Sequence, residues 1–495
     1  MSSSIKTVGE LKKAGWKSRS VKSEMRENLL RIMKNSAPVF PGIVGYEKTV
    51  IPQIQHAILS KHDMILLGLR GQAKTRILRM LVQFLDEEIP IIEGSEVNDD
   101  PFNPVSKYGR NLVEKYGDNT PVSWLKREKR YGEKLATPDT TVADLIGDLD
   151  PIKAASQKMN LSDEEVINFG LLPRANRGIF VINELPDLQP RIQVALLNLM
   201  QERDIQVRGF NVRFPLDLAV AFSANPEDYT NRGNIITPLK DRIDSQIITH
   251  YPKTIDSAIK ITGQEAWIGR GAGINVFIPP LFKEIIEEIA FEARSSEYVD
   301  QKSGVSARLT ITAMEQAVSA AERRAVINGD LKTVVRVTDL YHTVPAITGK
   351  IELVYEGEQE GAINVARHMV GKAIAKVFKR IFPDPQKRKG EEESPYQEIL
   401  NWFASGNSLE IADLLTDSEY RNRLEKIPGL KELTENYVTK DQEELYSVMD
   451  FLLDGLYQHS ILGKQDLDEV REYSDMIGSM LGGLENPGED DLDIL

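Results

Sequence analysis

The chain has 495 residues, of which 41% are hydrophobic and 27% charged, and its formal net charge is −14. This composition is typical of a soluble globular protein, and the length suggests about three domains. The acidic balance argues against a protein built around duplex nucleic acid, and the absence of cysteine excludes disulfides, thiolate metal sites and cysteine catalysis. No apolar run approaches the ~20 residues that a membrane span needs, and the first residues lack the apolar core of a secretory signal, so we expect a cytoplasmic protein.

The first half of the chain predicts an α/β domain. Residues 1–37 read as a helical segment, with a polar amphipathic helix over 8–36. After it, short runs that are nearly all apolar alternate with amphipathic helical patterns, which is typical of strands buried on both faces of a parallel sheet. We therefore expect an α/β core over 38–255, with strands at 64–69, 89–94, 178–183, 218–225 and 245–251.

The second half predicts mostly helices. The strand signal fades after residue 255, so 256–350 reads as a small helical domain. Further along we expect a lid extension at 351–382 that opens with a short strand at 351–361, a charged linker at 383–395, a helical region at 396–484 and an acidic, disordered tail at 485–495.

A glycine-rich segment, LLGLRGQAKTR, lies between an expected strand and an expected helix. This context is typical of a loop that cradles the phosphates of a nucleotide. Lys74 would reach the β- and γ-phosphates of ATP, and the Thr75 hydroxyl would bind Mg²⁺. Ala73 stands where the strict pattern has glycine, and its methyl group requires a negative φ there. An ordinary glycine-bearing turn is the alternative interpretation; the nucleotide-binding residues that we predict are Gly68, Arg70, Gly71, Gln72, Ala73, Lys74, Thr75 and Arg76.

A buried strand, GIFVIN, delivers Asn183 and then Glu184 at its end. A carboxylate in this place can orient the water that attacks a nucleotide, which makes Glu184 the candidate base. Asn183 stands where nucleotide hydrolases usually carry an aspartate beside Mg²⁺. An amide oxygen still accepts a hydrogen bond from a metal-bound water, but it lacks the charge, so the Mg²⁺ affinity should fall. Glu184 could equally be a carboxylate that the start of a helix favours.

Three later residues could complete a hydrolytic site. Asn225 ends the strand LAVAFSAN and could position the attacking water, although Asn-Pro is also an ordinary turn. Arg242 follows a short helix and could reach the nucleotide of a neighbouring subunit, and Arg308 at the start of a helix could fold over its own. The basic run at 124–130 could contact phosphates or could simply be a solvated face.

The order of these features resembles that of the AAA+ ATPases. Within them, GLRGQAKT, LIGDLDPIKA, GLLPRANRGIFVINE and VRGFNVRFPLDLAVAFSANPEDY are similar to the magnesium chelatase I subunit and MoxR-type group, over residues 38–345. The resemblance implies a parallel-sheet P-loop core, a small helical lid and an extra, mostly helical C-terminal region. It also implies a helix-2 insert at 141–178 and a hairpin at 204–214.

The resemblance also implies roles for single residues. Lys74 and Thr75 correspond to Walker A and Glu184 to the Walker B base, whereas Asn183 departs from the Walker B pattern. Asn225 corresponds to sensor 1, Arg308 to sensor 2, and Arg242 to the arginine of the family's Asp-Arg-Phe box, with Ile243 in place of the phenylalanine.

The function that follows is an ATP- and Mg²⁺-dependent remodelling ATPase that assembles as a homo-oligomeric ring, by resemblance a hexamer. Such proteins work with a von Willebrand A-domain partner in metal insertion or protein maturation; residues 351–495 lack that domain's Asp-x-Ser-x-Ser signature, so we expect a separate partner chain. Three alternatives stay open: a nucleotide-binding scaffold in which Asn183 has switched off turnover, a DNA remodeller acting through Arg208 and Arg213, and porphyrin metallation.

Overall fold

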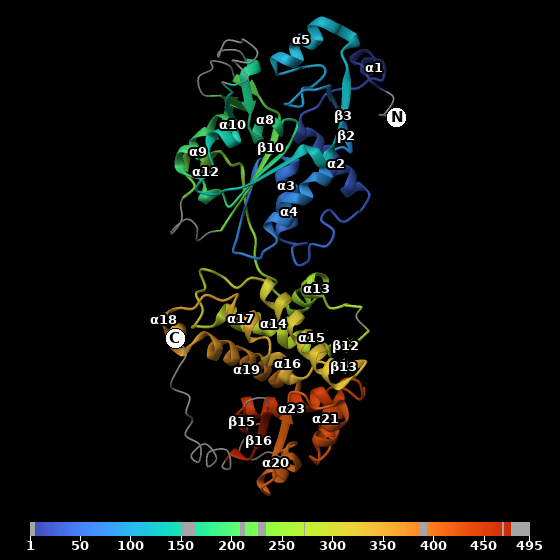
Figure 1. Cartoon of the computed structure of the whole chain (residues 1–495), viewed down its shortest axis with the longest axis vertical. Helices are drawn as coiled ribbons and strands as arrows, with labels where there is room; N and C mark the ends of the chain where they lie inside the picture. The colour runs from blue at the N-terminus through green and yellow to red at the C-terminus, as the bar shows by residue number, and fades with distance from the viewer. Residues whose placement is uncertain are drawn as a thin grey trace. The chain divides into compact units, whose positions relative to one another are not determined.

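The computed structural model describes residues 5–150, 152, 164–207, 213–225, 234–271, 273–385, 394–467 and 470–476. The chain divides into two compact units, Met1–Tyr251 and Pro252–Leu495 (Figure 1). Along the described part of the chain, no helix has both the length and the apolar character that a membrane span requires.

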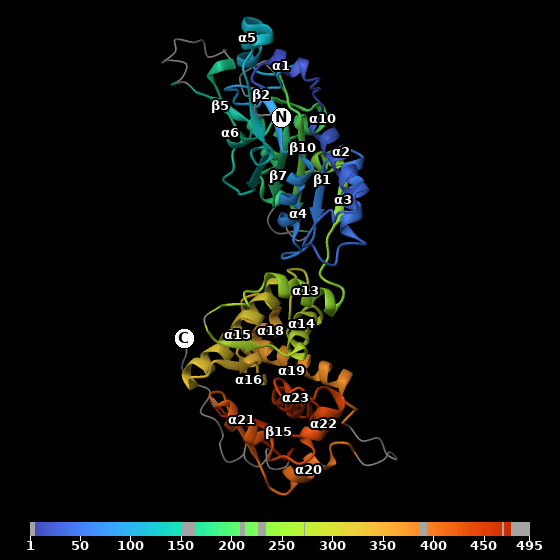
Figure 2. The same ribbon diagram turned by 90° about the vertical axis from the view of Figure 1, so that its right-hand side faces the viewer.

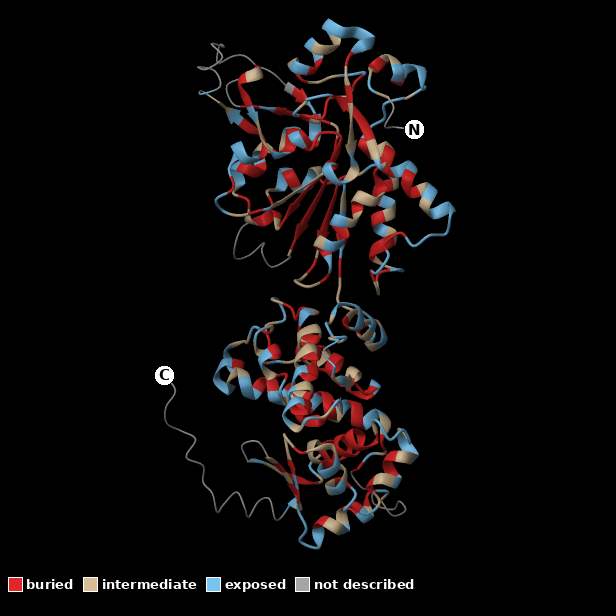
Figure 3. Ribbon diagram, turned by 45° about the vertical axis from the view of Figure 1, so that its right-hand side comes forward, coloured by how far each residue is buried: buried red, intermediate tan, exposed pale blue. Residues whose placement is uncertain are grey.

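The first unit is built on a five-stranded, all-parallel sheet, which confirms the predicted α/β core. Its three central strands are almost entirely buried, because side chains on both of their faces pack against helices, whereas the two edge strands are partly exposed (Figure 3). The strand order is β11 (Ser245–Ile248), β1 (Met64–Leu67), β10 (Leu218–Ala224), β7 (Gly178–Asn183), β4 (Tyr131–Leu135).

Alternate residues of each strand feed two separate hydrophobic cores. Ile179 and Val181 of β7 pack on one face, and Phe180 and Ile182 pack on the other. The first face is covered by α2 (Val21–Lys34), α3 (Val50–Leu59) and α4 (Lys74–Met80). The second face is covered by α8 (Leu171–Arg174), α9 (Pro190–Ala195), α10 (Leu197–Glu202) and α12 (Thr237–Arg242), and Figures 1 and 2 show the two helical layers.

One strand prediction for the first unit is wrong in detail, and one strand of the main sheet was not predicted. The run at 89–94 forms β2 (Glu88–Ile92), but β2 pairs antiparallel with β3 (Val122–Lys126) outside the main sheet. The edge strand β4 was missed, because YGEKL is polar and edge strands need not be apolar. The basic run before it ends in Arg130, which is 1% exposed and makes a two-pronged ion pair with Glu24, so Arg130 is not placed to contact phosphates.

The remaining elements of the first unit lie outside the main sheet. The expected N-terminal helix is two helices, α1 (Val8–Lys13) and α2. Within 141–178, two short strands pair antiparallel, and the strands that bound the predicted hairpin do the same. The hairpin tip, with Arg208 and Gly209, lies outside the described residues. These elements are α5 (Lys107–Tyr116), α6 (Val142–Leu145), β5 (Gly147–Leu149), β6 (Ile167–Phe169), β8 (Asp204–Gln206) and β9 (Arg213–Pro215).

The second unit is mostly helical. Its helices are α13 (Ile255–Glu265), α14 (Pro280–Ser295), α15 (Arg308–Asn328), α16 (Val337–Tyr341), α17 (Val344–Thr348), α18 (Tyr355–Glu360), α19 (Ala362–Ile381), α20 (Gln397–Ala404), α21 (Asp417–Leu424), α22 (Leu430–Tyr437) and α23 (Leu445–Gln458). Two parallel strands, β12 (Asn275–Phe277) and β13 (Lys332–Val334), form a small sheet. Three antiparallel strands form another in the order β14 (Leu409–Ala412), β16 (Val470–Ser474), β15 (Gly463–Leu467).

Two predictions for the second unit need correction. The segment expected to open with a strand at 351–361 instead forms α18, and the C-terminal region carries a three-stranded sheet besides its helices. One hydrophobic core extends from α14 to β16. Phe378 of α19 stands at its centre, with ring centroids 5.1 Å from Phe382 and 6.3 Å from Phe451. The expected acidic tail at 485–495 lies outside the described residues, as does 386–393 of the expected linker.

Candidate nucleotide site

Three strands of the main sheet end in the segments that the sequence predicts for nucleotide chemistry. The glycine-rich loop follows β1, Glu184 follows β7 and Asn225 follows β10. Because these strands are parallel and in register, with Leu67 opposite Ala224, their carboxyl ends meet at one edge of the sheet. Ligands bind at this edge in open parallel sheets.

The glycine-rich loop is held closed by side chains that the sequence analysis did not identify. The hydroxyl of Thr249, just after β11, donates to the Gln72 side chain at 2.6 Å, and the Tyr46 hydroxyl lies 3.0 Å from the Gln72 carbonyl. The Tyr251 hydroxyl donates to the Arg70 carbonyl at 2.9 Å. A side chain on Gly68 would place its Cβ 1.9 Å from Thr249 Oγ1, so only glycine fits there. Burial raises the pKa of Tyr46 to about 12, which keeps this hydroxyl protonated.

Ala73 has a left-handed backbone, with φ 58° and ψ 15°. The expectation of a negative φ at this position is therefore wrong. A left-handed residue with a Cβ costs about 1–2 kcal/mol, because the Cβ approaches the following carbonyl oxygen. The loop thus keeps the geometry that glycine usually provides, although alanine occupies the position.

Lys74 is buried and points back into the loop. Its ammonium group donates to the carbonyls of Gly68 and of Leu69, the latter at 3.0 Å, and to the side-chain oxygen of Asn225 at 2.6 Å. The loop carbonyls and Asn225 thus hold the charge that a phosphate would attract. A residue from a strand end 151 positions away is a direct neighbour of the loop lysine.

Asn225 also contacts the candidate base. Its Nδ2 donates to Glu184 Oε2 at 3.1 Å, so Lys74, Asn225 and Glu184 form one continuous hydrogen-bonded chain. Glu184 is left-handed, with φ 54°, and its backbone N–H donates to the Ser223 hydroxyl at 3.3 Å. Its side chain makes no capping bond to the short helix that follows, which disfavours the helix-start interpretation of Glu184.

Asn183 is 5% exposed and is fixed by two strands. Its Nδ2 donates to Glu133 Oε1 at 2.6 Å, and its Oδ1 accepts from the Ser223 hydroxyl at 2.9 Å. Glu133, on β4, receives two further bonds from Arg79 of α4, at 2.8 and 3.1 Å. The sequence analysis missed Glu133 because it missed β4. Strand alternation could have placed Asn183 on the same face of the sheet as Ile179 and Val181, and hence under α4.

The two predicted arginines lie on different units of the chain. Arg242, at the end of α12, donates twice to Gln201 Oε1, at 3.0 and 2.7 Å, and once to the Pro238 carbonyl at 2.7 Å. Arg308 begins α15 in the second unit and is exposed. The structure thus brings together Lys74, Asn225, Glu184 and Asn183, and leaves Arg242 bonded to residues of its own unit.

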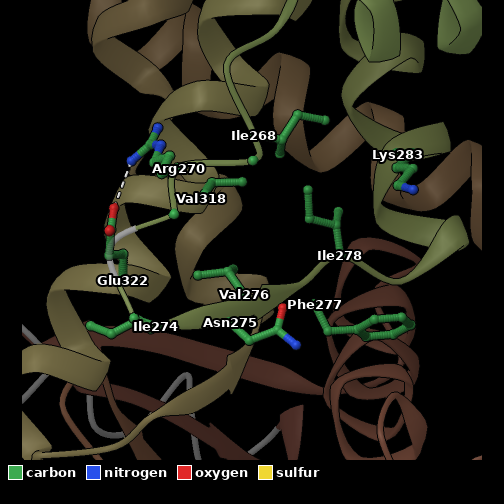
Figure 4. A pocket seen from close by; sticks show the side chains of 13 residues that line it. Ile268, Arg270, Ile274, Asn275, Val276, Phe277, Ile278, Lys283, Val318 and Glu322 are labelled. Atoms are coloured by element: carbon green, nitrogen blue, oxygen red, sulfur yellow. Dashed lines mark hydrogen bonds and ion pairs between the residues drawn. The ribbon is translucent and has the colours of Figure 1, made fainter.

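The second unit has a hollow of about 580 Å³ of its own, beside the strand β12 (Figure 4). Its walls include Asn275, Phe277 and Lys283. Arg270 donates to Glu322 at 2.7 Å across one side, so these two charges neutralise each other. The residues that the sequence predicts for the nucleotide site are not among those that line this hollow.

Part of the first unit is similar to a known protein family. Residues 123–243 match the family described as AAA domain (dynein-related subfamily), a stretch that contains Asn183, Glu184, Asn225 and Arg242. The magnesium-chelatase subunit ChlI of Guillardia theta is 28% identical over 236 residues, which cover 46% of this chain and 63% of that protein. Residues 123–243 are thus similar to an AAA domain. About half of the chain is related to the I subunits of magnesium chelatase.

Other relatives of the chain are similarly distant. The chloroplastic subunit ChlI-1 of Arabidopsis thaliana is 27% identical over 240 residues, covering 47% of this chain and 53% of that protein. The chain therefore matches less than two thirds of the length of these curated relatives. The solved complex between subunits BchI and BchD of magnesium chelatase contains a chain that is 20% identical, with 65% of this chain and 98% of that chain covered. Its TM-score of 0.33 is too low to support an argument.

Proposed function

We propose that this AAA+ protein hydrolyses ATP and uses the energy to remodel a partner. The observation that carries the proposal is the chain of hydrogen bonds from Lys74 through Asn225 to Glu184. It joins a phosphate-binding group, a polar amide and a carboxylate at the edge of the sheet where ligands bind. A phosphate-binding scaffold would need the lysine but not the amide and the carboxylate.

Bound ATP would compete with the present partners of Lys74. The γ-phosphate offers the ammonium group a full charge in place of carbonyl and amide oxygens, so Lys74 would turn toward it. Asn225 would then be available to orient the attacking water. Glu184 would accept a proton from that water as its oxygen bonds to the γ-phosphorus, and the bond from phosphorus to the ADP oxygen breaks.

Thr75 and Asn183 are the residues that would hold Mg²⁺, which neutralises phosphate charge when it is bound. Thr75 lies at the second position of α4, and Asn183 presents an amide oxygen that already accepts one bond from Ser223. An amide oxygen with a second lone pair fits a metal-bound water. Because Asn183 is uncharged, we expect hydrolysis that is slow and needs more Mg²⁺ than a site with aspartate.

Assembly and partners follow from the relationship to magnesium chelatase. We infer a homo-oligomeric ring, a hexamer, in which Arg242 leaves Gln201 to reach the nucleotide of the next subunit. Arg308 would act on the nucleotide of its own subunit. We further infer a separate partner chain with a von Willebrand A domain, and a role in metal insertion or protein maturation in the cytoplasm.

The experiment that tests this function is steady-state ATP turnover of the full chain beside the Glu184→Gln variant. Loss of the general base should lower turnover at least ~100-fold while ATP binding stays. The competing scaffold function, in which Asn183 has abolished hydrolysis, predicts that both proteins bind ATP and neither turns it over. Absence of ATP binding to the wild-type chain would contradict both functions.

A further inference from the structure

The carboxylate that Asn183 lacks is present on the neighbouring strand. β4 pairs parallel with β7, with Leu135 opposite Asn183 and Glu133 opposite Val181. Glu133 reaches along the sheet to the Asn183 amide, at 2.6 Å. The side chains of Glu133, Asn183 and Ser223 therefore meet on the α4 side of the sheet.

Glu133 also determines how the Asn183 amide is oriented. A carboxylate only accepts hydrogen bonds, so it selects the NH₂ end of the amide. The amide oxygen is then directed to the other side, where Ser223 donates to it at 2.9 Å. Asn183 is buried, so few water molecules can reach its amide and compete with these two partners. Glu133 thus holds Asn183 with its oxygen available for a second bond.

The helix α4 connects this pair to the nucleotide loop. Arg79, which binds Glu133, lies four residues after Thr75, so both project from the same face of α4. Thr75 therefore lies one helical turn before Arg79, on the face of α4 that carries the contact with Glu133. The charge of Glu133 lies next to the residues that would hold Mg²⁺, although Arg79 offsets part of it.

We propose that Glu133 is a positioning residue for Mg²⁺: it supplies the negative charge that Asn183 lacks and fixes the orientation of the Asn183 amide. The carboxylate that nucleotide hydrolases usually carry at the end of the strand equivalent to β7 is here supplied by the adjacent strand β4. This inference rests on the proposed function, because it requires a nucleotide that binds with Mg²⁺.

The test is binding of the slowly hydrolysed analogue ATPγS to the full chain, measured by calorimetry across a Mg²⁺ titration and in EDTA. Glu133→Gln should raise the Mg²⁺ concentration at half-effect roughly tenfold, as the loss of a residue behind a metal ligand commonly does. Binding in EDTA should stay unchanged. Glu128→Gln, an exposed carboxylate near β4, is the matched control and should leave both values unchanged.

Arg79→Gln separates this role from a purely structural one. If Glu133 only anchors α4 through Arg79, both substitutions break the same ion pair and shift the Mg²⁺ requirement in the same direction. If its charge serves the metal, Arg79→Gln unmasks that charge and lowers the requirement. The exchange Glu133→Gln with Asn183→Asp restores one acid and one amide, and should return the requirement to near the wild-type value.

Three results would overturn the proposal: an unchanged Mg²⁺ requirement in Glu133→Gln, shifts of the same sign in Glu133→Gln and Arg79→Gln, or an exchange variant as weak as Glu133→Gln. In each of these cases the wild-type chain still binds the nucleotide, so the proposed function stands. A wild-type chain that binds no ATPγS with or without Mg²⁺ would overturn both.

Discussion

At the scale of single residues, the roles of Lys74, Glu184 and Asn225 could be proposed from local patterns. Each follows a buried strand, and parallel strands bring their ends together. The hydrogen-bonded chain itself could not be predicted, because it depends on the conformation of the Lys74 side chain and on the register of β1, β10 and β7. Glu133 could not be predicted either, because its contact with Asn183 depends on the register of two strands that are far apart in sequence.

The strained backbone of Ala73 leads to a prediction for stability. Ala73→Gly should remove a backbone strain of about 1–2 kcal/mol. Glycine also raises the conformational entropy of the unfolded chain, which lowers stability by about 0.4–1 kcal/mol. We expect the free energy of unfolding of the first unit to stay level or to rise by up to about 1.6 kcal/mol in urea denaturation. Ala14→Gly, at a position with φ −73°, is the control and should destabilise. Equal losses in both variants would show that Ala73 is not strained.

Glu287 leads to a prediction for pH dependence. This residue of α14 is buried, and burial raises its pKa to about 7 even though Thr262, Thr310 and Arg294 lower it. Because the folded state binds the proton more tightly than the unfolded state, its contribution to stability is fully present below pH ~4.5 and is lost as the pH rises through ~7.

Glu287→Gln should remove this dependence. The variant should gain roughly 2–3 kcal/mol relative to the wild-type chain between pH 5 and pH 8, measured as the free energy of unfolding of the second unit. Glu297→Gln, an exposed change near the end of the same helix, should leave the dependence in place. A wild-type slope that persists in Glu287→Gln would contradict the assignment.

At the scale of elements, apolar runs predicted the central strands β1, β7 and β10, because strands buried on both faces carry a nearly continuous apolar sequence, and the run at 245–251 predicted the edge strand β11. The polar edge strand β4 has no such pattern, and β2 has the pattern but joins β3 instead of the main sheet. The helix pair α19 and α23 was predicted as helices but not as neighbours. The contact depends on Gly455, which leaves room for Phe378.

Gly455→Ala should therefore destabilise the second unit. The added Cβ would lie 2.1 Å from a ring carbon of Phe378, and Phe378 is enclosed on its other sides by Phe382 and Phe451. We expect a loss of about 1–3 kcal/mol, the usual cost of overpacking, in urea denaturation. Gly263→Ala, in the open on α13, should be neutral or stabilising. A loss no larger than that of the control would contradict the close packing.

At the scale of the whole molecule, the chain has two units with separate hydrophobic cores. The helices of the expected lid share their core with residues 396–476, which composition alone did not indicate. Deletion of 396–495 should expose the face of α19 around Phe378 and abolish the cooperative unfolding of the second unit. ATP binding should remain, since its residues lie in Met1–Tyr251. Loss of binding in a correctly folded first unit would contradict this division of roles.

The central claim is that Lys74, Asn225 and Glu184 act together on ATP. The most direct measurement is phosphate release in a single turnover at saturating ATP and Mg²⁺, with the affinity for ATP measured on the same samples. For Glu184→Gln and Asn225→Ala we predict an affinity within about threefold of the wild-type value and release that is at least ~100-fold slower. Phosphate release at the wild-type rate in either Asn225→Ala or Glu184→Gln would contradict the claim.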